Sequence, residues 1–464
     1  PDNDIYTNLG SAASISSWGN GYNASGLFSS FARINYKLME RYLFTFTGRY
    51  DGSSMFGSNN RYGFFPSGAI AWRISQEKFM KNLTFINDLK LRASVGTTGT
   101  QNLTSFSNRD LYEATSYNNL SAIIHKQVGN RDIRWEKSTQ YDLGLDFALF
   151  DYRLTGSISG YIKDTKDLIW SFDFPPSATG GSMQMNRNIG ALTNRGIEIN
   201  LVGRVLSTKD WNLDLTLNMS HNKNKVTKLV EEGRAQSAMN VVVQGSYADQ
   251  VLAVGYPMGA FHGYEYAGII QDQARIDELN AYAKSKGQSY YDGNSLKPGH
   301  LEIKDLNGDG IINYNDRVII GNPDPDLFGG LTANLSYKQF SLFANFGYQI
   351  GGLKIYNKTL QNLPGQLTGL IDYGLNDRWS DTNKDAKYPA LYIGDGVPRL
   401  TDHELFNASF FRLQEVRLTY NLPLNKVIKG QLFVSATNLF TLTSYPGTDP
   451  ATVNRNSNYG GNYE

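Results

Sequence analysis

The sequence predicts an all-β protein, an antiparallel transmembrane β-barrel, because two kinds of alternation run along it. Within strand-like segments, apolar and polar residues alternate with period two, which gives a sheet one apolar and one polar face. Between those segments, short and long connections take turns. Short turns at one end of the sheet and long loops at the other are typical of outer-membrane barrels.

Each predicted strand carries the alternation for about ten residues, the length of a tilted bilayer crossing. In 135–149, apolar Tyr141, Leu143 and Leu145 alternate with Asp142 and Asp146. The other predicted strands are 28–38, 42–51, 63–74, 89–97, 153–162, 197–205, 211–221, 327–338, 340–349, 411–422 and 431–440. A soluble β-sandwich also alternates, but its strands are usually about 5–6 residues long. Strand length therefore favours the barrel.

The polar faces of the predicted strands carry charged side chains. Those expected to face an aqueous lumen are Arg33, Arg49, Arg92, Glu136, Asp142 and Asp214. A water-filled lumen accommodates such groups, and so does the solvated outer face of a sandwich. The order of the connections decides between the two, because a sandwich has no reason to alternate short and long ones.

The predicted long external loops are about 97–134, 163–196, 222–326 and 350–410. An intermediate connection at 75–88 is expected to contain a helical turn. On this pattern both ends of the chain lie on the long-loop side, whereas a complete bacterial barrel begins and ends on the periplasmic side. We therefore expect 1–464 to form part of a larger barrel whose other strands, including the closing strand, lie outside it.

Composition excludes several function classes. The chain has 464 residues, a net charge of +1 and no cysteine, and no apolar run approaches the ~20 residues of a spanning helix. Near-neutral charge argues against nucleic-acid binding, and the lack of cysteine excludes disulfide and thiolate chemistry. The five histidines are scattered, and no HExxH, GxSxG or Walker motif occurs. We therefore expect no enzyme.

One stretch has the spacing of a calcium-binding loop. Residues 305–316 read DLNGDGIINYND, which resembles an EF-hand loop with Asp in place of Glu at its last position. The predicted ligands are Asp305, Asn307, Asp309, the carbonyl of Ile311, and Asp316. Gly310 would permit the sharp turn. The alternative is an Asp/Asn/Gly-rich turn without an ion. Bound Ca²⁺ would stabilise a loop and would not be catalytic.

Aromatic residues in the predicted loops and strand ends are weaker candidates for a substrate site. Such rings stack on sugars or on peptide side chains. The residues are Tyr112, Trp170, Tyr290, Tyr291 and Trp379. For any single one of them, the alternative is that it packs one loop against another.

Several longer stretches are similar to a known family. They include FPSGAIAWRISQEKFM (65–80), RWEKSTQYDLGLDFALFDYRLTGSISGYIKDTKDLI (134–169), DLNGDGIINYNDRVIIGNPDPDLFGGL (305–331) and SFFRLQEVRLTYNLP (409–423). The chain resembles the SusC/RagA family of TonB-dependent outer-membrane transporters, in order and along nearly its whole length.

The resemblance implies a barrel of about 22 strands with a plugged lumen in the outer membrane. It also implies a SusD-like surface lipoprotein as a lid, TonB as the source of energy, and import of glycans or peptides. The plug and the TonB-interacting segment are expected outside this chain. Two alternatives remain: a passive porin, and a soluble, calcium-stabilised surface adhesin or glycan-binding protein.

Overall fold

The structure, a computed structural model, describes residues 23–117, 120–174, 183–229, 241–243, 250–291, 296–356, 377–390, 400–423, 430–447 and 449–451. Parts of the predicted long loops therefore lie outside the described residues. The chain forms two compact units, one of residues 1–204 and 224–240 and the other of 205–223 and 241–464. Within the described ranges, no helix is both long and apolar enough to cross a membrane.

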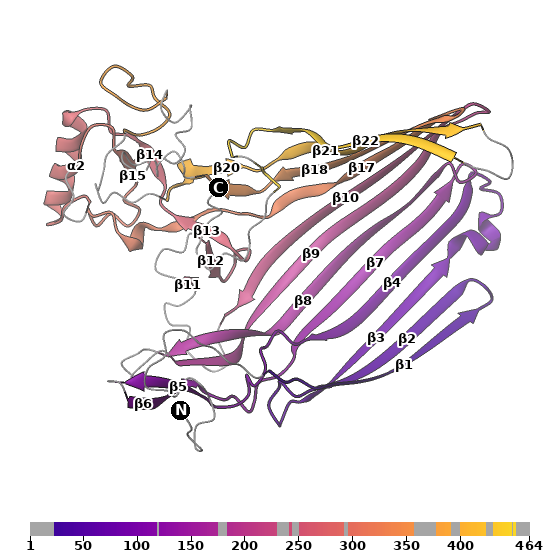
Figure 1. The fold of residues 1–464 in the computed structure, drawn as a ribbon, viewed down its shortest axis with the longest axis horizontal. Helices are drawn as coiled ribbons and strands as arrows, with labels where there is room; N and C mark the ends of the chain where they lie inside the picture. Colours follow the sequence, from indigo (N-terminus) through magenta and orange to yellow (C-terminus); the bar gives the residue numbers. More distant parts are fainter. Residues whose placement is uncertain are drawn as a thin grey trace. The chain divides into compact units, whose positions relative to one another are not determined.

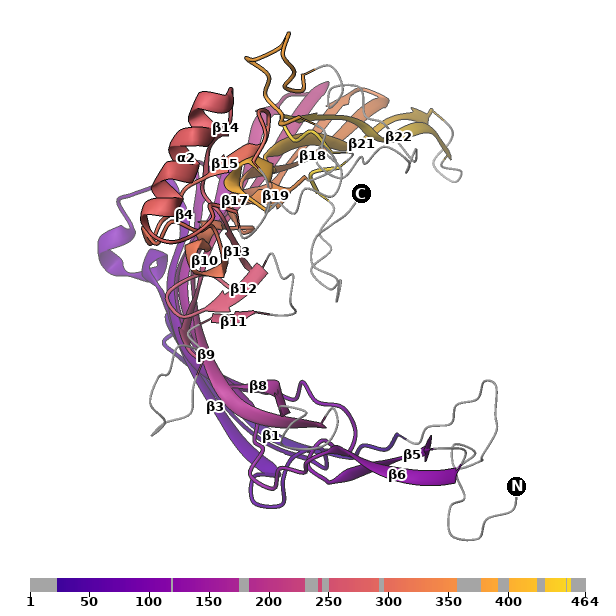
Figure 2. The ribbon, with the colours of Figure 1, turned by 90° about the vertical axis from the view of Figure 1, so that its left-hand side faces the viewer.

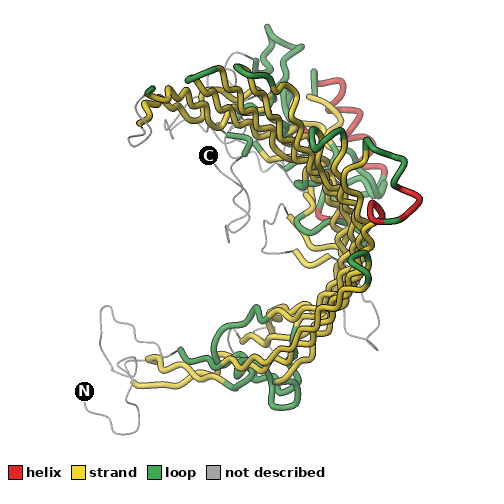
Figure 3. The backbone as a smooth tube through the Cα atoms, turned by 90° about the vertical axis from the view of Figure 1, so that its right-hand side faces the viewer, coloured by secondary structure: helices red, strands yellow, loops and turns green. Residues whose placement is uncertain are grey.

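The first unit is an antiparallel sheet in which consecutive long strands pair. Its order is β1 (Leu27–Leu38), β2 (Tyr42–Ser53), β3 (Tyr62–Arg73), β4 (Ile86–Thr100), β7 (Glu136–Leu149), β8 (Leu154–Phe174) and β9 (Met183–Ser207). Figure 1 shows these strands running side by side, and Figure 3 draws them as a single layer. β5 (Leu111–Tyr117) and β6 (Leu120–Gln127) form a hairpin that joins this sheet through one parallel pair, Gln127 with Gln184 on β9. Two 3₁₀ turns, η2 (Ile74–Gln76) and η3 (Lys78–Met80), connect β3 to β4.

The second unit repeats this arrangement with the order β10 (Trp211–Lys228), β17 (Pro325–Tyr337), β18 (Phe340–Gly351), β21 (Phe410–Leu422) and β22 (Gly430–Thr443). Short elements fill its long connections: β11 (Val241–Val243), β12 (Gln250–Ala253), β13 (Ala260–Gly263), β14 (Tyr266–Ile269), α2 (Gln273–Ser285), β15 (Leu301–Ile303), η4 (Tyr314–Asp316), β16 (Val318–Gly321), β19 (Leu353–Ile355), η5 (Asp402–Glu404) and β20 (Leu405–Asn407). Figures 1 and 2 both show α2 beside the antiparallel pair of β14 and β15.

All the strands predicted from the alternation are confirmed, and so is the helical turn within 75–88. The main difference lies in the predicted loop 163–196. β8 continues to Phe174 and β9 begins at Met183, so most of this stretch is a paired hairpin. The predicted loop 97–134 likewise contains β5 and β6.

Strand register brings the apolar residues of neighbouring strands onto one face. In the first unit, Phe44 on β2 lies opposite Ile70 on β3, and Ala93 on β4 lies opposite Leu143 on β7. In the second unit the same rule gives the pairs Leu215–Ala333, Leu342–Leu418 and Leu418–Val434. Because opposite residues project from the same side of a sheet, each unit has one continuous apolar face.

This apolar face is exposed. Tyr141 is 52% exposed, Leu143 is 59% exposed and Val434 is 77% exposed. A second sheet packed on these residues would have buried them, so the sandwich interpretation is wrong. Contiguous apolar patches on soluble monomers rarely exceed a few hundred Å². A face that spans every long strand of a unit therefore requires lipid as its surroundings.

Candidate functional site

The polar face of the first unit carries a network of paired charges between β4 and β7. Asp146 accepts from Lys90 Nζ at 2.7 Å and from Arg92 Nε at 3.1 Å. Asp142 accepts from Ser94 Oγ at 3.1 Å and from Gln140 Nε2 at 2.8 Å. Both carboxylates therefore have hydrogen-bond partners, and three of the four partners lie on the neighbouring strand β4. The face is therefore suited to line a water-filled channel.

A glycine makes room for one of these cations. Gly144 lies opposite Arg92 in the β4–β7 register. A Cβ at position 144 would lie 2.6 Å from the guanidinium carbon of Arg92, which is closer than real contacts allow. Any larger residue at position 144 would therefore displace the Arg92 guanidinium from its place across β7, where it reaches Asp146.

The remaining predicted lumen-facing residues also lie on the polar faces. Arg33 Nε donates to Thr47 Oγ1 at 3.1 Å, and Arg49 Nε donates to Asp51 at 2.7 and 2.8 Å. Glu136 is buried at the long-loop end of β7, where it accepts from Ile169 N at 2.8 Å. Asp214, in the second unit, lies opposite Asn334 on the polar face of β10 and β17.

Loops cover part of the polar face at the long-loop end of the first unit. Phe56, Phe65, Ile133 and Trp135 form a buried cluster there, and the Trp135 indole donates to Arg61 O at 3.2 Å. The predicted site residue Tyr112 is 66% exposed and stacks on His125 with a centroid distance of 4.8 Å. Trp170 is half-buried on β8, opposite Arg187. Of the predicted stacking residues, Tyr112 is thus the most accessible.

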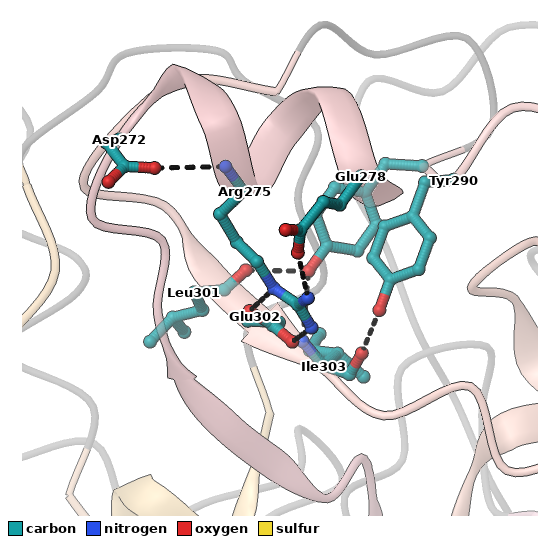
Figure 4. A network of polar contacts seen from close by, with 8 residues as sticks. Asp272, Arg275, Glu278, Tyr290, Leu301, Glu302 and Ile303 are labelled. Carbon is teal, nitrogen blue, oxygen red and sulfur yellow. Dashed lines mark hydrogen bonds and ion pairs between the residues drawn. The ribbon is translucent and has the colours of Figure 1, made fainter. Parts of the chain in front are cut away.

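The second unit carries a folded lobe, which we define as the described residues 264–316. Its core is a cluster of Ile270, Ile276, Leu279, Ala283, Tyr290, Tyr291, Ile303 and Ile312. Asp272 caps α2 by accepting from Arg275 N at 2.9 Å. The Arg275 guanidinium binds both oxygens of Glu302, at 2.7 and 3.1 Å, and Glu278 at 2.7 Å (Figure 4). Paired donors of this kind fix α2 to β15.

Two predicted stacking residues lie in the core of the lobe. Tyr290 donates to Ile303 O at 2.5 Å (Figure 4), and Tyr291 donates to Leu301 O at 2.6 Å. Burial raises the pKa of both hydroxyls, which therefore remain protonated donors. Trp379, which lies outside the lobe, is also buried, and its indole donates to Gln271 Oε1 at 2.9 Å. All three side chains are buried and pack between segments of the second unit, which was the alternative to stacking on a substrate.

The predicted calcium loop closes on itself through its carboxylates. Asp305 accepts from Gly308 N and Gly310 N, both at 2.7 Å, and Asp309 accepts from Ile311 N at 3.0 Å. The buried Asp316 accepts from Leu306 N at 3.0 Å. Burial would raise the pKa of Asp305, but the N–H groups of Gly310 and Gly308 and the Tyr282 hydroxyl hold that pKa below its usual range, so the carboxylate is charged.

The backbone at Gly310 also has the sharp-turn conformation that the spacing of the loop predicted. Gly310 has φ +85°, a conformation that favours glycine. Asn307 Oδ1 accepts from Asp309 N at 2.8 Å. Across the described ranges, no three or more His, Cys, Asp or Glu side chains are placed to hold a metal. A cation here would therefore also need the oxygens of Asn307 and Ile311.

A histidine joins several loop segments of the second unit. His403 Nδ1 lies 3.3 Å from Glu404 Oε1, and His403 Nε2 lies 2.8 Å from Lys387 O. Burial would lower the pKa of His403, but the adjacent Glu404 carboxylate raises it above its ordinary value. The contact between His403 and Glu404 therefore stabilises the fold at pH values below the ordinary histidine pKa. This stabilisation is lost as the pH rises through the raised pKa of His403.

Sequence reasoning missed several of these residues. The first turn of α2 was detectable, since Asp272 precedes Ile276, Leu279 and Ala283 at helical spacing. The pairings of Arg275 with Glu302 and of His403 with Lys387 join residues far apart in sequence. No local pattern indicates them.

Comparisons with known proteins agree on one family. The family model described as "TonB dependent receptor-like, beta-barrel" matches residues 1–318. TonB-dependent receptor P3 of Formosa agariphila is 36% identical over 448 residues, 94% of this chain and 43% of that protein. TonB-dependent receptor SusC of Bacteroides thetaiotaomicron is 32% identical over 442 residues, 91% of this chain and 41% of that protein. The structure of the RagAB peptide transporter matches with a TM-score of 0.74 and 29% identity, over 92% of this chain and 45% of that one. The chain thus spans less than half the length of these relatives.

Proposed function

Because this chain belongs to the TonB-dependent receptor-like β-barrel family and is an outer-membrane protein, we propose that it forms barrel strands of an energised importer of oligosaccharides or peptides. In this proposal, 1–464 is part of a longer barrel that encloses a plug. TonB supplies energy through a segment outside this chain. A SusD-like surface lipoprotein covers the mouth, where the long loops 222–326 and 350–410 meet it.

The proposal rests on one observation: the same long strands carry an apolar face on one side and a polar face on the other. Lipid surrounds the apolar face, and the polar face, which carries charge pairs such as Arg92 with Asp146, lines a wet interior. The similarity to a SusC and to a peptide transporter supports import as the use of that interior. Import makes and breaks no covalent bond in the substrate, which agrees with the sequence, where no catalytic motif was found.

Energy dependence separates this proposal from a passive porin. Cells that make the full-length protein are expected to take up a fluorescent oligosaccharide or peptide only while the proton-motive force is intact. A protonophore should then reduce uptake to the level of cells that lack the protein. Uptake that persists unchanged in the presence of the protonophore would identify a porin instead. Parallel assays with the two ligand classes would decide which one is imported.

We also propose that residues 305–316 bind Ca²⁺ as a structural ion. The support is the charged Asp305, the left-handed Gly310 and the oxygen-rich donor set. The oxygens of Asp305, Asn307, Asp309, Ile311 and Asp316 would hold the ion. Because the three carboxylates do not converge without it, binding would rearrange the loop.

Removing two carboxylates tests the ion. The double variant Asp305→Ala, Asp309→Ala of the full-length protein is expected to bind Ca²⁺ about tenfold more weakly or worse, because affinity follows the number of charged ligands. Calorimetric titration measures this. Asp381→Ala, in another Asp/Asn-containing turn, should leave the affinity unchanged. Equal affinity in the double variant and the parent protein would disprove the site.

A further inference from the structure

The connection between β3 and β4 differs from the other short turns. Residues 74–85, which we call the foot, contain both 3₁₀ turns and read ISQEKFMKNLTF. Phe79 is 65% exposed, and Leu83 and Phe85 are also exposed. Lys78 and Lys81 are exposed on the same segment, and within the described part of the chain neither has an ion-pair partner. A short turn in water would not need this many exposed apolar side chains.

A carboxylate holds the foot to the sheet. Glu77 accepts from Arg41 Nη1 at 2.6 Å, from Tyr42 Oη at 2.8 Å and from Trp72 Nε1 at 3.1 Å. Three donors on one carboxylate fix the position of the segment. The Tyr42 hydroxyl in particular lowers the pKa of Glu77, so that Glu77 stays ionised.

Two of these donors locate the foot on the lipid side of the sheet. Tyr42 and Trp72 lie opposite each other, in register with Phe44 and Ile70, and therefore belong to the apolar face. Figure 2 shows the same segment, in purple, projecting from the outer side of the curve that the strands of its unit make. The foot thus continues the apolar face beyond the ends of β3 and β4.

The foot also lies at the short-turn end. Glu77 pairs with Arg41 in the β1–β2 turn, and Phe150 N in the β7–β8 turn donates to Phe85 O at 2.8 Å, so the foot contacts both neighbouring short turns. Short turns of outer-membrane barrels face the periplasm. The surface next to this end of the apolar face is therefore the phospholipid headgroup layer of the inner leaflet.

We propose that the foot binds phospholipid: Phe79 and Leu83 enter the acyl-chain boundary, while Lys78 and Lys81 contact the lipid phosphates. Continuity with the lipid-facing strands brings the segment to the headgroup layer. The positive charges complement the negative phosphates there, and each basic residue near such a surface contributes measurably to attraction. Apolar side chains flanked by lysines are typical of segments that lie in a membrane interface.

The depth of position 79 in the bilayer tests the apolar part. This chain contains no cysteine, so Phe79→Cys in the full-length protein takes a nitroxide label, with the unsubstituted protein as background. In vesicles of phosphatidylethanolamine and phosphatidylglycerol, we expect the label to be accessible to oxygen and shielded from a water-soluble nickel chelate. A label at Glu40→Cys, in the β1–β2 turn, should show the reverse. If both labels were equally accessible to the chelate, the proposal would be wrong.

Lipid retention tests the lysines. Native mass spectrometry of the Lys78→Gln, Lys81→Gln variant should show several-fold less bound phosphatidylglycerol than the parent protein. The matched pair Lys284→Gln, Lys286→Gln, in the last turn and at the C-cap of α2, removes the same charge and should show no loss. Equal retention in the two double variants would refute the phosphate contact. A label at position 79 that becomes shielded only when a periplasmic protein is added would show that the foot binds protein instead.

Discussion

Replacement of Leu143 by arginine is expected to destabilise the folded barrel by about 2–4 kcal/mol, because a charge at the middle of the lipid-facing surface has no water and no partner. Leu143 lies near the middle of β7, opposite Ala93 on β4 and Gly160 on β8. It is exposed on the apolar face, so the arginine would project into hydrocarbon. Urea unfolding of the full-length protein in phospholipid vesicles measures the loss.

Two other arginine substitutions serve as controls for Leu143→Arg. Ser157→Arg places the same charge on the polar face, opposite Asp146, and should cost close to nothing. Leu154→Arg places it on the apolar face but at the end of β8, where the expected loss is only about 0–1 kcal/mol. If Ser157→Arg were the most harmful of the three, the assignment of the two faces would have to be reversed.

Alternation found the membrane strands because lipid on one side and water on the other impose it on every residue. The outer halves of β8 and β9 escaped prediction for the same reason. Residues 163–174 extend past the apolar band, so neither face must be apolar and the period-two signal is lost. The hairpin shows itself only through pairings such as Trp170 with Arg187.

The lobe could not be predicted in the same way. β14 and β15 have four and three residues, which is too short for a period to be recognised. The sequence supplied the aromatic residues Tyr290 and Tyr291 but not their burial, because burial depends on α2 and β15 closing over them. The polar pairs could not be predicted from local sequence either. Lys90 and Asp146 meet only because register places them opposite each other, and register is not a local property of either strand.

Truncation of Tyr291 to alanine is expected to unfold the lobe locally while the barrel strands stay folded. The side chain is 1% exposed, and its hydroxyl donates to Leu301 O at 2.6 Å and accepts from Ile303 N at 3.2 Å. Removing a large buried ring costs about 3–5 kcal/mol, and each buried backbone group left without a partner costs about 1–3 kcal/mol. Together these approach the whole stability of a small folded region, roughly 5–15 kcal/mol. Hydrogen exchange of the β14 and β15 amides in the full-length protein measures the loss of protection.

Three further variants make the Tyr291 result specific. Tyr291→Phe keeps the ring and loses only the hydroxyl, so we expect partial loss of protection, corresponding to about 1–3 kcal/mol. Tyr282→Ala removes an exposed ring on α2 whose hydroxyl donates to Asp305 at 3.0 Å, and it should leave β14 and β15 protected. Leu143→Arg should lower barrel stability without changing exchange in the lobe. If Tyr291 acted on substrate instead, Tyr291→Ala would reduce uptake while the amides of β14 and β15 stayed protected, because a ring that stacks on a ligand is not needed to hold α2 against β15.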